Sequence, residues 1–167
     1  LGWEMPPDWV NSINPVFIII LSGVFAALWT KLGTRQPSTP IKFAAGVIVM
    51  GLAFLLFLPF AGGGPAATPL LGIVGILFVF TVAELLISPV GLSAATKLAP
   101  ARFQTQMVAL FFLSVSLGTA ISGLLAPLYN PENEVPYFSI LAAIAIVLGL
   151  ALAAARKPVL ALMRDVR

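Results

Sequence analysis

One carboxylate lies in the middle of a long apolar segment, where an acid is energetically unfavourable. Glu84 occurs in the run FTVAELL at residues 80–86. A charged side chain at the centre of a bilayer costs about 3 kcal/mol, and burial disfavours the charged form. In a helix, Thr81, Ser88 and Gly91 would share a face with Glu84, because they lie three before, four after and seven after it. We therefore interpret Glu84 as a proton-binding group that faces a polar cavity.

Pro89 follows Glu84 in the same segment and predicts a bend in its helix. Proline cannot donate a backbone hydrogen bond to the Leu85 carbonyl, so the helix loses one internal bond there. Bent spans with polar groups at mid-depth are typical of substrate sites in secondary transporters. The alternative is that Glu84 is neutral and hydrogen-bonded inside a bundle that transports nothing. The functional interpretation is favoured, because acids inside membranes usually mark ion or substrate pathways.

Asn14, which is followed by Pro15, has two possible roles in the first apolar segment. It could cap a helix that begins at Pro15, because Asn is a preferred N-cap and Pro is favoured at the first helical position. A helix from Pro15 to Thr30 would be about 24 Å long, which is short for a hydrocarbon core of about 30 Å. If the helix instead starts near Trp9, Asn14 lies below the membrane surface and can face a cavity. The residues alone leave both alternatives open.

The composition excludes several kinds of chemistry. The 167 residues include no Cys, no His and only six Asp or Glu, which leaves no thiolate nucleophile, no imidazole base and no recognisable metal-ligand set. One buried carboxylate is a poor catalytic set, so we predict no enzyme activity and no cofactor. With 60% hydrophobic and 9% charged residues, a soluble domain, a disordered chain and a nucleic-acid-binding protein are also excluded.

Five apolar segments are long enough to cross a bilayer, which requires about 20 residues in a helix. Segments rich in Gly and Pro separate them and are turn signals. The predicted fold class is therefore an all-α integral membrane protein with five transmembrane helices, whose immediate partner is the lipid bilayer. The predicted spans are residues 9–30, 43–60, 69–93, 105–128 and 137–155.

The basic residues all lie on one side of these five spans, in alternate loops and in the tail. All nine lie in the first loop, in the third loop or in the tail at residues 156–167. Four acidic residues lie on the other side: Glu4, Asp8, Glu132 and Glu134. By the positive-inside rule, the N-terminus is outside and the C-terminus is in the cytoplasm of a multi-pass cell-membrane protein. The basic residues are Lys31, Arg35, Lys42, Lys97, Arg102, Arg156, Lys157, Arg164 and Arg167.

The fourth segment carries small residues at a spacing of four, namely Ser114, Gly118 and Ser122. A stripe of small residues lets helices approach closely, so helix packing is favoured here over ligand contact. An odd number of spans that starts outside suggests that one span is missing upstream. The sequence also begins with Leu1 rather than Met, so it reads as starting within a longer protein.

Two regions of the sequence resemble one transporter family. Residues 12–20 read SINPVFIII and residues 28–33 read LWTKLG. Both are similar to the eighth membrane span of the proton-dependent oligopeptide transporters, which belong to the major facilitator superfamily. Residues 83–93 read AELLISPVGLS and residues 96–100 read TKLAP, which resembles the tenth span of that family. The resemblance covers about residues 9–128, and the five segments would correspond to spans eight to twelve.

The resemblance implies a symporter that carries di- and tripeptides with protons by alternating access. It implies that Glu84 lies near the amino terminus of the peptide and takes part in proton coupling or gating, with Ser88 in the cavity near it. Asn14 matches an asparagine that contacts the peptide, which favours the cavity role over the cap. Phe111 stands where the eleventh span of the family has a cavity Trp, and Ala83 replaces a usual glycine.

The resemblance also implies a partner that this sequence does not contain. The N-terminal half of the transporter would complete the substrate cavity and would carry the cation that faces Glu84. The C-terminal half would then form one wall of that cavity. The alternative is a non-transporting membrane subunit, or an interaction fragment, that retains the half-fold.

Overall fold

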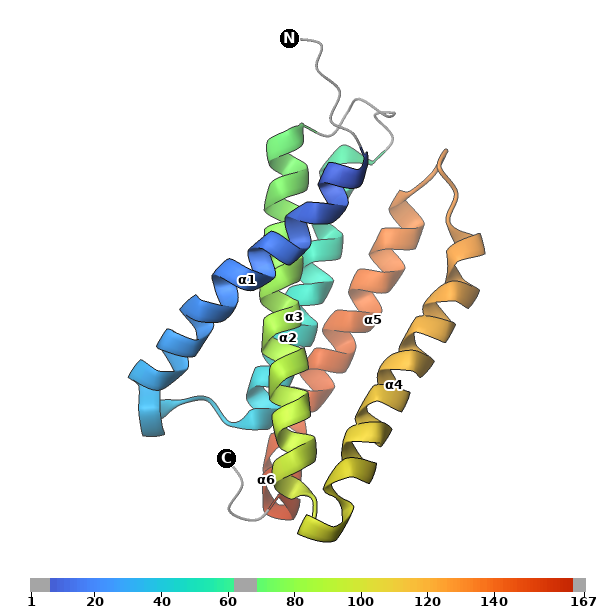
Figure 1. Cartoon of the computed structure of the whole chain (residues 1–167). Helices are drawn as coiled ribbons and strands as arrows, with labels where there is room; N and C mark the ends of the chain where they lie inside the picture. The colour runs from blue at the N-terminus through green and yellow to red at the C-terminus, as the bar shows by residue number, and fades with distance from the viewer. Residues whose placement is uncertain (1–6, 62–68, 164–167) are drawn as a thin grey trace.

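Helices make up the regular secondary structure of residues 7–61 and 69–163, which the computed structural model describes (Figure 1). Residues 1–6, 62–68 and 164–167 lie outside this description, as do the predicted N-terminal lead, most of the second loop and the end of the tail. The α-helices are α1 (Pro7–Leu32), α2 (Thr39–Leu55), α3 (Leu70–Leu98), α4 (Gln104–Leu125), α5 (Val135–Ala154) and α6 (Arg156–Leu162). Single 3-10 turns adjoin them: η1 (Gly33–Arg35), η2 (Leu58–Phe60), η3 (Ala101–Phe103) and η4 (Ala126–Leu128).

The predicted fold class is confirmed, because five helical stretches are long and apolar enough to cross a membrane. The stretches are Ser12–Arg35, Thr39–Phe60, Leu70–Leu98, Ala101–Leu128 and Val135–Ala154. The short helix α6 lies within the predicted tail. α3 runs beyond the predicted end at residue 93, because nothing before Pro100 breaks the helix. Ala99, which precedes that proline, is extended with ψ of 133°, as a residue before proline prefers.

Glycine and proline mark the end of α1 and the start of α2. α1 stops before Gly33, whose φ is +47°, a left-handed conformation that glycine adopts without steric cost. Ser38 occupies the N-cap position of α2 in an extended conformation, and Pro40 lies in the first turn. The short connection between α1 and α2 brings the end of α1 and the start of α2 to the same end of the bundle (Figure 1).

α2 packs against α5 and α3 through small residues (Figure 1). A Cβ atom on Gly51 would lie 2.7 Å from Ile146 Cγ1, which is closer than real side chains approach. A Cβ atom on Gly149 would lie 2.5 Å from Ile48 Cγ1. The backbones of α2 and α5 therefore meet at a distance that only glycine permits at these positions.

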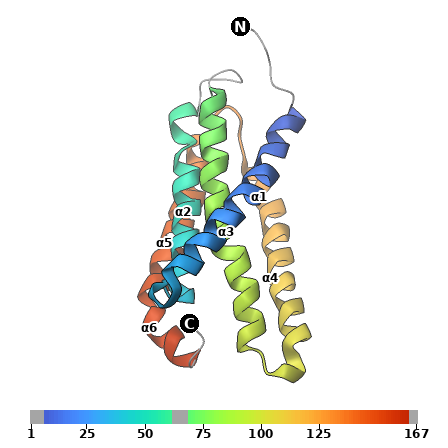
Figure 2. The ribbon, with the colours of Figure 1, turned by 60° about the vertical axis from the view of Figure 1, so that its left-hand side comes forward.

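α1 and α4 cover less of α3 than α2 does. α1 crosses α3 obliquely, and α4 runs along the second half of α3 (Figure 2). α4 contains no buried residue, and a Cβ atom on Gly118 would meet nothing within 4 Å. The packing predicted for the stripe of Ser114, Gly118 and Ser122 is therefore not formed within the described part of the chain.

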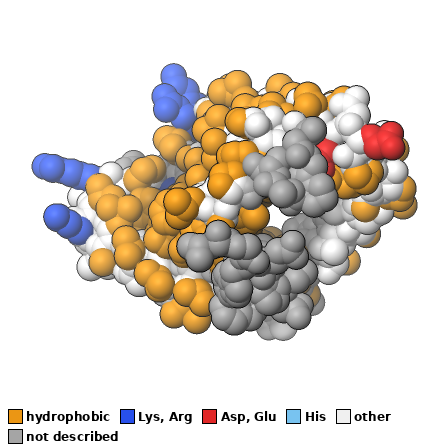
Figure 3. Space-filling view, turned by 90° about the horizontal axis from the view of Figure 1, so that it is seen from above, with side chains coloured by type: hydrophobic (Ala, Val, Ile, Leu, Met, Phe, Trp, Pro, Cys, Tyr) orange, Lys and Arg blue, Asp and Glu red, His pale blue; other side chains and the backbone are white. Residues whose placement is uncertain are grey.

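Large apolar side chains lie on the outer surface of the bundle (Figure 3). Ile19 on α1 is 74% exposed, Leu71 on α3 is 84% exposed and Leu124 on α4 is 77% exposed. Exposure of this extent needs a lipid or protein environment, because a water-facing surface of this kind would associate.

Candidate functional site

Asn14 on α1 meets Thr81 and Glu84 on α3 where the two helices cross. The Thr81 hydroxyl donates a hydrogen bond to Asn14 Oδ1 at 2.7 Å. The Asn14 amide nitrogen in turn donates to Glu84 Oε2 at 3.5 Å, near the long limit for a hydrogen bond. The structure thus brings two predicted site residues together, although they lie 70 positions apart in the sequence.

The path of α1 excludes one of the two roles considered for Asn14, the N-cap. α1 begins at Pro7 and continues through Pro15, so Asn14 lies inside the helix and is not its N-cap. About one turn away on each helix, Phe17 and Phe78 meet edge to face with ring centroids 5.7 Å apart. The aromatic contact stabilises the helix crossing next to the polar one.

Thr81 sets the direction in which the Asn14 amide points. Its side chain is fully buried, with 0% exposure, and its single hydroxyl proton has two acceptors within reach. These are Asn14 Oδ1 at 2.7 Å and the Leu77 carbonyl oxygen at 2.8 Å. A bond to Oδ1 identifies that atom as the acceptor and directs the NH₂ group toward Glu84. The helical spacing placed Thr81 on the Glu84 face, but no signal in the sequence indicated its bond to Asn14.

This arrangement can bind an ammonium group and a proton. The Asn14 NH₂ group has a second N–H, and the Glu84 carboxylate has a second oxygen. A charged carboxylate attracts an ammonium group, whereas a protonated one donates an O–H instead. Among the described residues, no Lys or Arg forms an ion pair with Glu84, and no group of three or more His, Cys, Asp or Glu could hold a metal ion.

The other predicted site residues lie further along α3 or on α4. Ser88 and Pro89 are exposed, about one turn beyond Glu84. α3 continues through Pro89 as one helix and changes direction in its second half (Figure 2); the assignment of this bend to Pro89 stays a prediction. Phe111 is half-buried, and a Cβ atom on Gly91 would lie 2.6 Å from its Cε2 atom. The Phe111 ring therefore packs against the backbone of α3.

Several known sequences similar to this chain are named as peptide transporters. The sequence model of the POT family matches residues 1–147. The chain is 42% identical over 167 residues to the di-/tripeptide transporter of Lactococcus lactis subsp. cremoris, and the match covers 99% of this chain and 34% of that protein. It is 45% identical over 157 residues to the di-/tripeptide transporter of Lactococcus lactis subsp. lactis strain IL1403, covering 93% of this chain and 32% of that protein.

Solved structures have the same helix arrangement. A crystal structure of the peptide transporter POT in complex with sulfate matches with a TM-score of 0.82 at 45% identity, covering 94% of this chain and 32% of that one. A POT family transporter in complex with 5-aminolevulinic acid matches with a TM-score of 0.77 at 34% identity, covering 86% and 30%. The chain thus spans about a third of the length of the proteins that it matches.

Proposed function

The chain belongs to the POT family of transporters, as two regions of its sequence predicted, and we propose that it forms part of a proton-coupled di-/tripeptide symporter. In this proposal its five long helices contribute the C-terminal wall of a substrate cavity that works by alternating access. The family match over residues 1–147 supports the proposal, and so do two relatives that are named di-/tripeptide transporters.

The observation that carries this proposal is the contact between Asn14 and Glu84 across two helices. A peptide has an ammonium group at its amino end and amide groups along its backbone. Glu84 supplies a negative charge for the ammonium group, and Asn14 supplies an N–H donor for a backbone carbonyl. Ser88 adds a hydroxyl about one turn along α3, and Phe111 adds an aromatic ring from α4.

Proton coupling follows from the two protonation states of Glu84. The charged carboxylate accepts hydrogen bonds from Asn14 and from the ammonium group of a peptide. Uptake of a proton removes the charge and turns one oxygen into a donor, so a peptide amino group is held less strongly. A proton gradient then drives transport if the two protonation states favour different conformations of the whole transporter. The cation that faces Glu84 would belong to a part of the transporter outside this chain.

The proposed orientation has the N-terminus outside and the C-terminus in the cytoplasm of a cell membrane. The end of α1, the end of α3 and the start of α4 lie together at one end of the bundle (Figure 1). Lys31, Lys97 and Arg102 occupy or adjoin these ends. Glu132 and Glu134 lie in the loop at the opposite end. An excess of basic residues on cytoplasmic loops supports this orientation.

Peptide uptake by the intact transporter that contains this chain tests the proposal. In proteoliposomes, Glu84→Gln keeps the size of the side chain and one acceptor oxygen for Asn14 but removes the negative charge and the exchangeable proton. We expect proton-driven accumulation of a labelled dipeptide to fall by about 10- to 100-fold, whereas exchange of labelled for unlabelled peptide continues.

The matched control is Glu132→Gln, because Glu132 is an exposed loop carboxylate whose loss should leave uptake unchanged. If Glu84→Gln kept the rate of accumulation and its pH dependence, the role of Glu84 in coupling would be wrong. If no form of the protein transported peptides, the alternative of a non-transporting membrane subunit would be favoured.

A further inference from the structure

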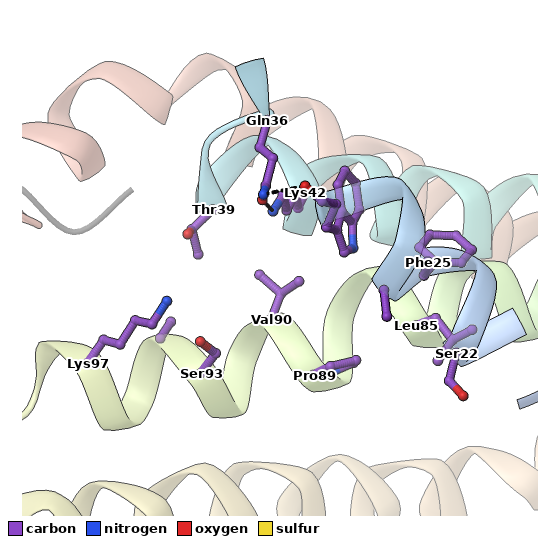
Figure 4. A pocket seen from close by; sticks show the side chains of 13 residues that line it. Ser22, Phe25, Gln36, Thr39, Lys42, Leu85, Pro89, Val90, Ser93 and Lys97 are labelled. Carbon is purple, nitrogen blue, oxygen red and sulfur yellow. Dashed lines mark hydrogen bonds between the residues drawn. The ribbon is translucent and has the colours of Figure 1, made fainter. Parts of the chain in front are cut away.

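A cavity lies apart from the contact between Asn14 and Glu84. It has a volume of about 350 Å³ and is lined by the second half of α1, the connection to α2, the start of α2 and the second half of α3 (Figure 4). Neither Asn14, Thr81 nor Glu84 lines it. The cavity is therefore a separate site, located toward the end of the bundle that carries the basic loops.

One ammonium group in this cavity is held in a fixed position. Lys42 Nζ donates a hydrogen bond to Gln36 Oε1 at 2.8 Å and lies 4.1 Å from the centroid of the Trp29 ring. Gln36 is itself held, because its amide nitrogen donates to the Trp29 carbonyl oxygen at 2.7 Å. The ring attracts the cation through its electron-rich face. An ammonium group has three N–H donors, so Lys42 can still donate to a ligand while it keeps the bond to Gln36.

A second lysine reaches the same cavity from α3. Lys97 lines the cavity together with Ser93, one turn earlier on the helix (Figure 4). No Asp or Glu lines the cavity among the described residues. Two like charges that share a cavity repel each other, and a bound anion would remove that repulsion. The hydroxyl groups of Ser93 and Thr39 provide two further hydrogen-bond donors in the lining.

The part of the cavity away from Lys97 is mostly apolar. Phe25 on α1 and the α3 residues Leu85 and Pro89 form this part of the lining, together with Ser22 of α1 (Figure 4). In Figure 4, Lys97, Ser93 and Pro89 follow one another along α3, so the wall changes from basic to apolar in the direction of the helix middle. A ligand that fills such a cavity has an anionic head and an apolar part.

We propose that Lys42 and Lys97 bind the phosphate group of an anionic ligand in this cavity. The phosphate has two possible sources, an anionic phospholipid of the surrounding bilayer and dissolved inorganic phosphate. Anionic lipids collect in the cytoplasmic leaflet and are bound by basic pockets between transmembrane helices. The apolar lining would accommodate the start of an acyl chain. This proposal for Lys42 and Lys97 is independent of the proposal that the protein transports peptides.

Lipid retention tests the phospholipid source. The intact protein is placed in nanodiscs of phosphatidylcholine that contain a minor fraction of phosphatidylglycerol, and the lipids retained are counted by native mass spectrometry. We expect wild-type protein to retain phosphatidylglycerol in preference to phosphatidylcholine. Lys97→Glu should lower its affinity by about 10-fold or more, whereas Lys97→Arg should keep it. Lys31→Gln is the matched control, because Lys31 lies at the same end of the bundle but does not line the cavity.

Inorganic phosphate is added in a second arm, to protein in nanodiscs of phosphatidylcholine alone. Binding next to Lys42 should change the fluorescence of Trp29, and Trp29→Phe should remove that signal. A response to phosphate, with no preference for phosphatidylglycerol, identifies dissolved phosphate as the source. Lys97 is exposed, so Lys97→Glu should not impair folding, and thermal unfolding checks this. The proposal is overturned if Lys97→Glu binds both ligands as wild type does, or if Lys31→Gln loses as much affinity.

Discussion

The two sides of α3 are built in different ways. On one side α2 packs closely against α3 and α5, and a Cβ atom on Gly46 of α2 would lie 2.6 Å from Ile87 Cγ1 of α3. On the other side α1 crosses α3 at a polar contact, and α4 contains no fully buried residue. Glycine is present on both sides, but a Cβ atom on Gly118 of α4 meets nothing within 4 Å. The same residue type therefore permits close packing between α2 and its neighbours, whereas at Gly118 of α4 it faces open space.

The side chains follow the same division. Between α2, α3 and α5, aromatic rings stack, and the rings of Phe57 and Phe138 lie 4.9 Å apart at an angle of 9°. On α4, by contrast, the Ser116 hydroxyl bonds back to the carbonyl of Phe112 at 3.0 Å. A hydroxyl satisfied in this way needs no partner on another helix. The difference indicates that α2 and α5 form a closely packed support, and that Asn14 and Glu84, the groups proposed to bind a peptide, lie on the open side.

The largest effect is expected from alanine at a glycine of the packed side. In Gly149→Ala, the added Cβ atom would lie 2.5 Å from Ile48 Cγ1 and 3.1 Å from the Ala44 carbonyl oxygen. Because a backbone atom cannot rotate away, α2 and α5 must separate. Overpacking of this kind costs about 1–3 kcal/mol. We expect Gly149→Ala to have a lower thermal unfolding temperature than the wild-type protein when both are purified in detergent.

The matched control is Gly118→Ala on the open side. Nothing lies within 4 Å of its Cβ position, and alanine favours a helix over glycine by about 1 kcal/mol, so stability should be unchanged or slightly higher. An equal loss of stability in Gly118→Ala and Gly149→Ala would contradict this difference between the two sides, because α4 would then pack against a neighbour outside the described residues. Gly51→Ala provides a second variant on the packed side, at 2.7 Å from Ile146 Cγ1.

The sequence predicted the five helices and drew attention to Glu84 for physical reasons that are local, whereas the cavity role of Asn14 was implied only by the family resemblance. Membrane length and apolar composition are properties of one segment, and Glu84 is recognisable because an acid is costly there. The bond between Thr81 and Asn14 joins residues 67 positions apart. It depends on where α1 crosses α3, and no local pattern records that position. The same is true of the cavity between Lys42 and Lys97.

The stripe of Ser114, Gly118 and Ser122 shows the limit of a spacing argument. Its spacing of four predicted a packed face, but within the described part of the chain the glycine at its centre meets no neighbour. The close packing occurs instead between α2 and α5, where Gly51 meets Ala142 and Ala145, and Gly149 follows these two alanines on the same face of α5. Spacing indicates which face of a helix carries small side chains, whereas the position of the neighbouring helix decides whether that face is packed.

An intermediate effect is expected at the polar crossing itself. Thr81→Val keeps the shape of the buried side chain but removes the donor to Asn14 Oδ1, so the amide is free to turn away from Glu84. Loss of one buried hydrogen bond should cost about 1 kcal/mol of stability. If Asn14 binds the peptide, the KM for peptide uptake should rise by about 5-fold.

Thr81→Ser is the control, because serine restores the hydroxyl and should restore the KM. The contrast between a support and a ligand-binding side would be sharpened if Thr81→Val raised the KM while Gly149→Ala lowered only stability. A variant Thr81→Val with reduced stability and an unchanged KM would show that the crossing is structural and that Asn14 does not need a fixed orientation.

The smallest effect is expected in the loop that joins α4 on the open side to α5 on the packed side. The Tyr129 hydroxyl donates a hydrogen bond to Glu134, and its ring lies 5.5 Å from that of Tyr137 at the start of α5. The hydrogen bond to Glu134, followed by burial and the charge of Glu134, raises the pKa of Tyr129 above its ordinary value of 10.0.

The raised pKa of Tyr129 determines how this contact responds to pH. Only the neutral phenol donates the bond, so its contribution is complete below pH 10 and is lost as the pH rises through the raised pKa. The phenolate absorbance of wild-type protein minus that of Tyr129→Phe isolates this residue. Glu134→Gln should lower its titration midpoint, and Glu132→Gln should not. An unchanged midpoint in Glu134→Gln would mean that the hydrogen bond between Tyr129 and Glu134 does not contribute to the loop between α4 and α5. The ring contact with Tyr137 at the start of α5 would then be the contact that orders this loop.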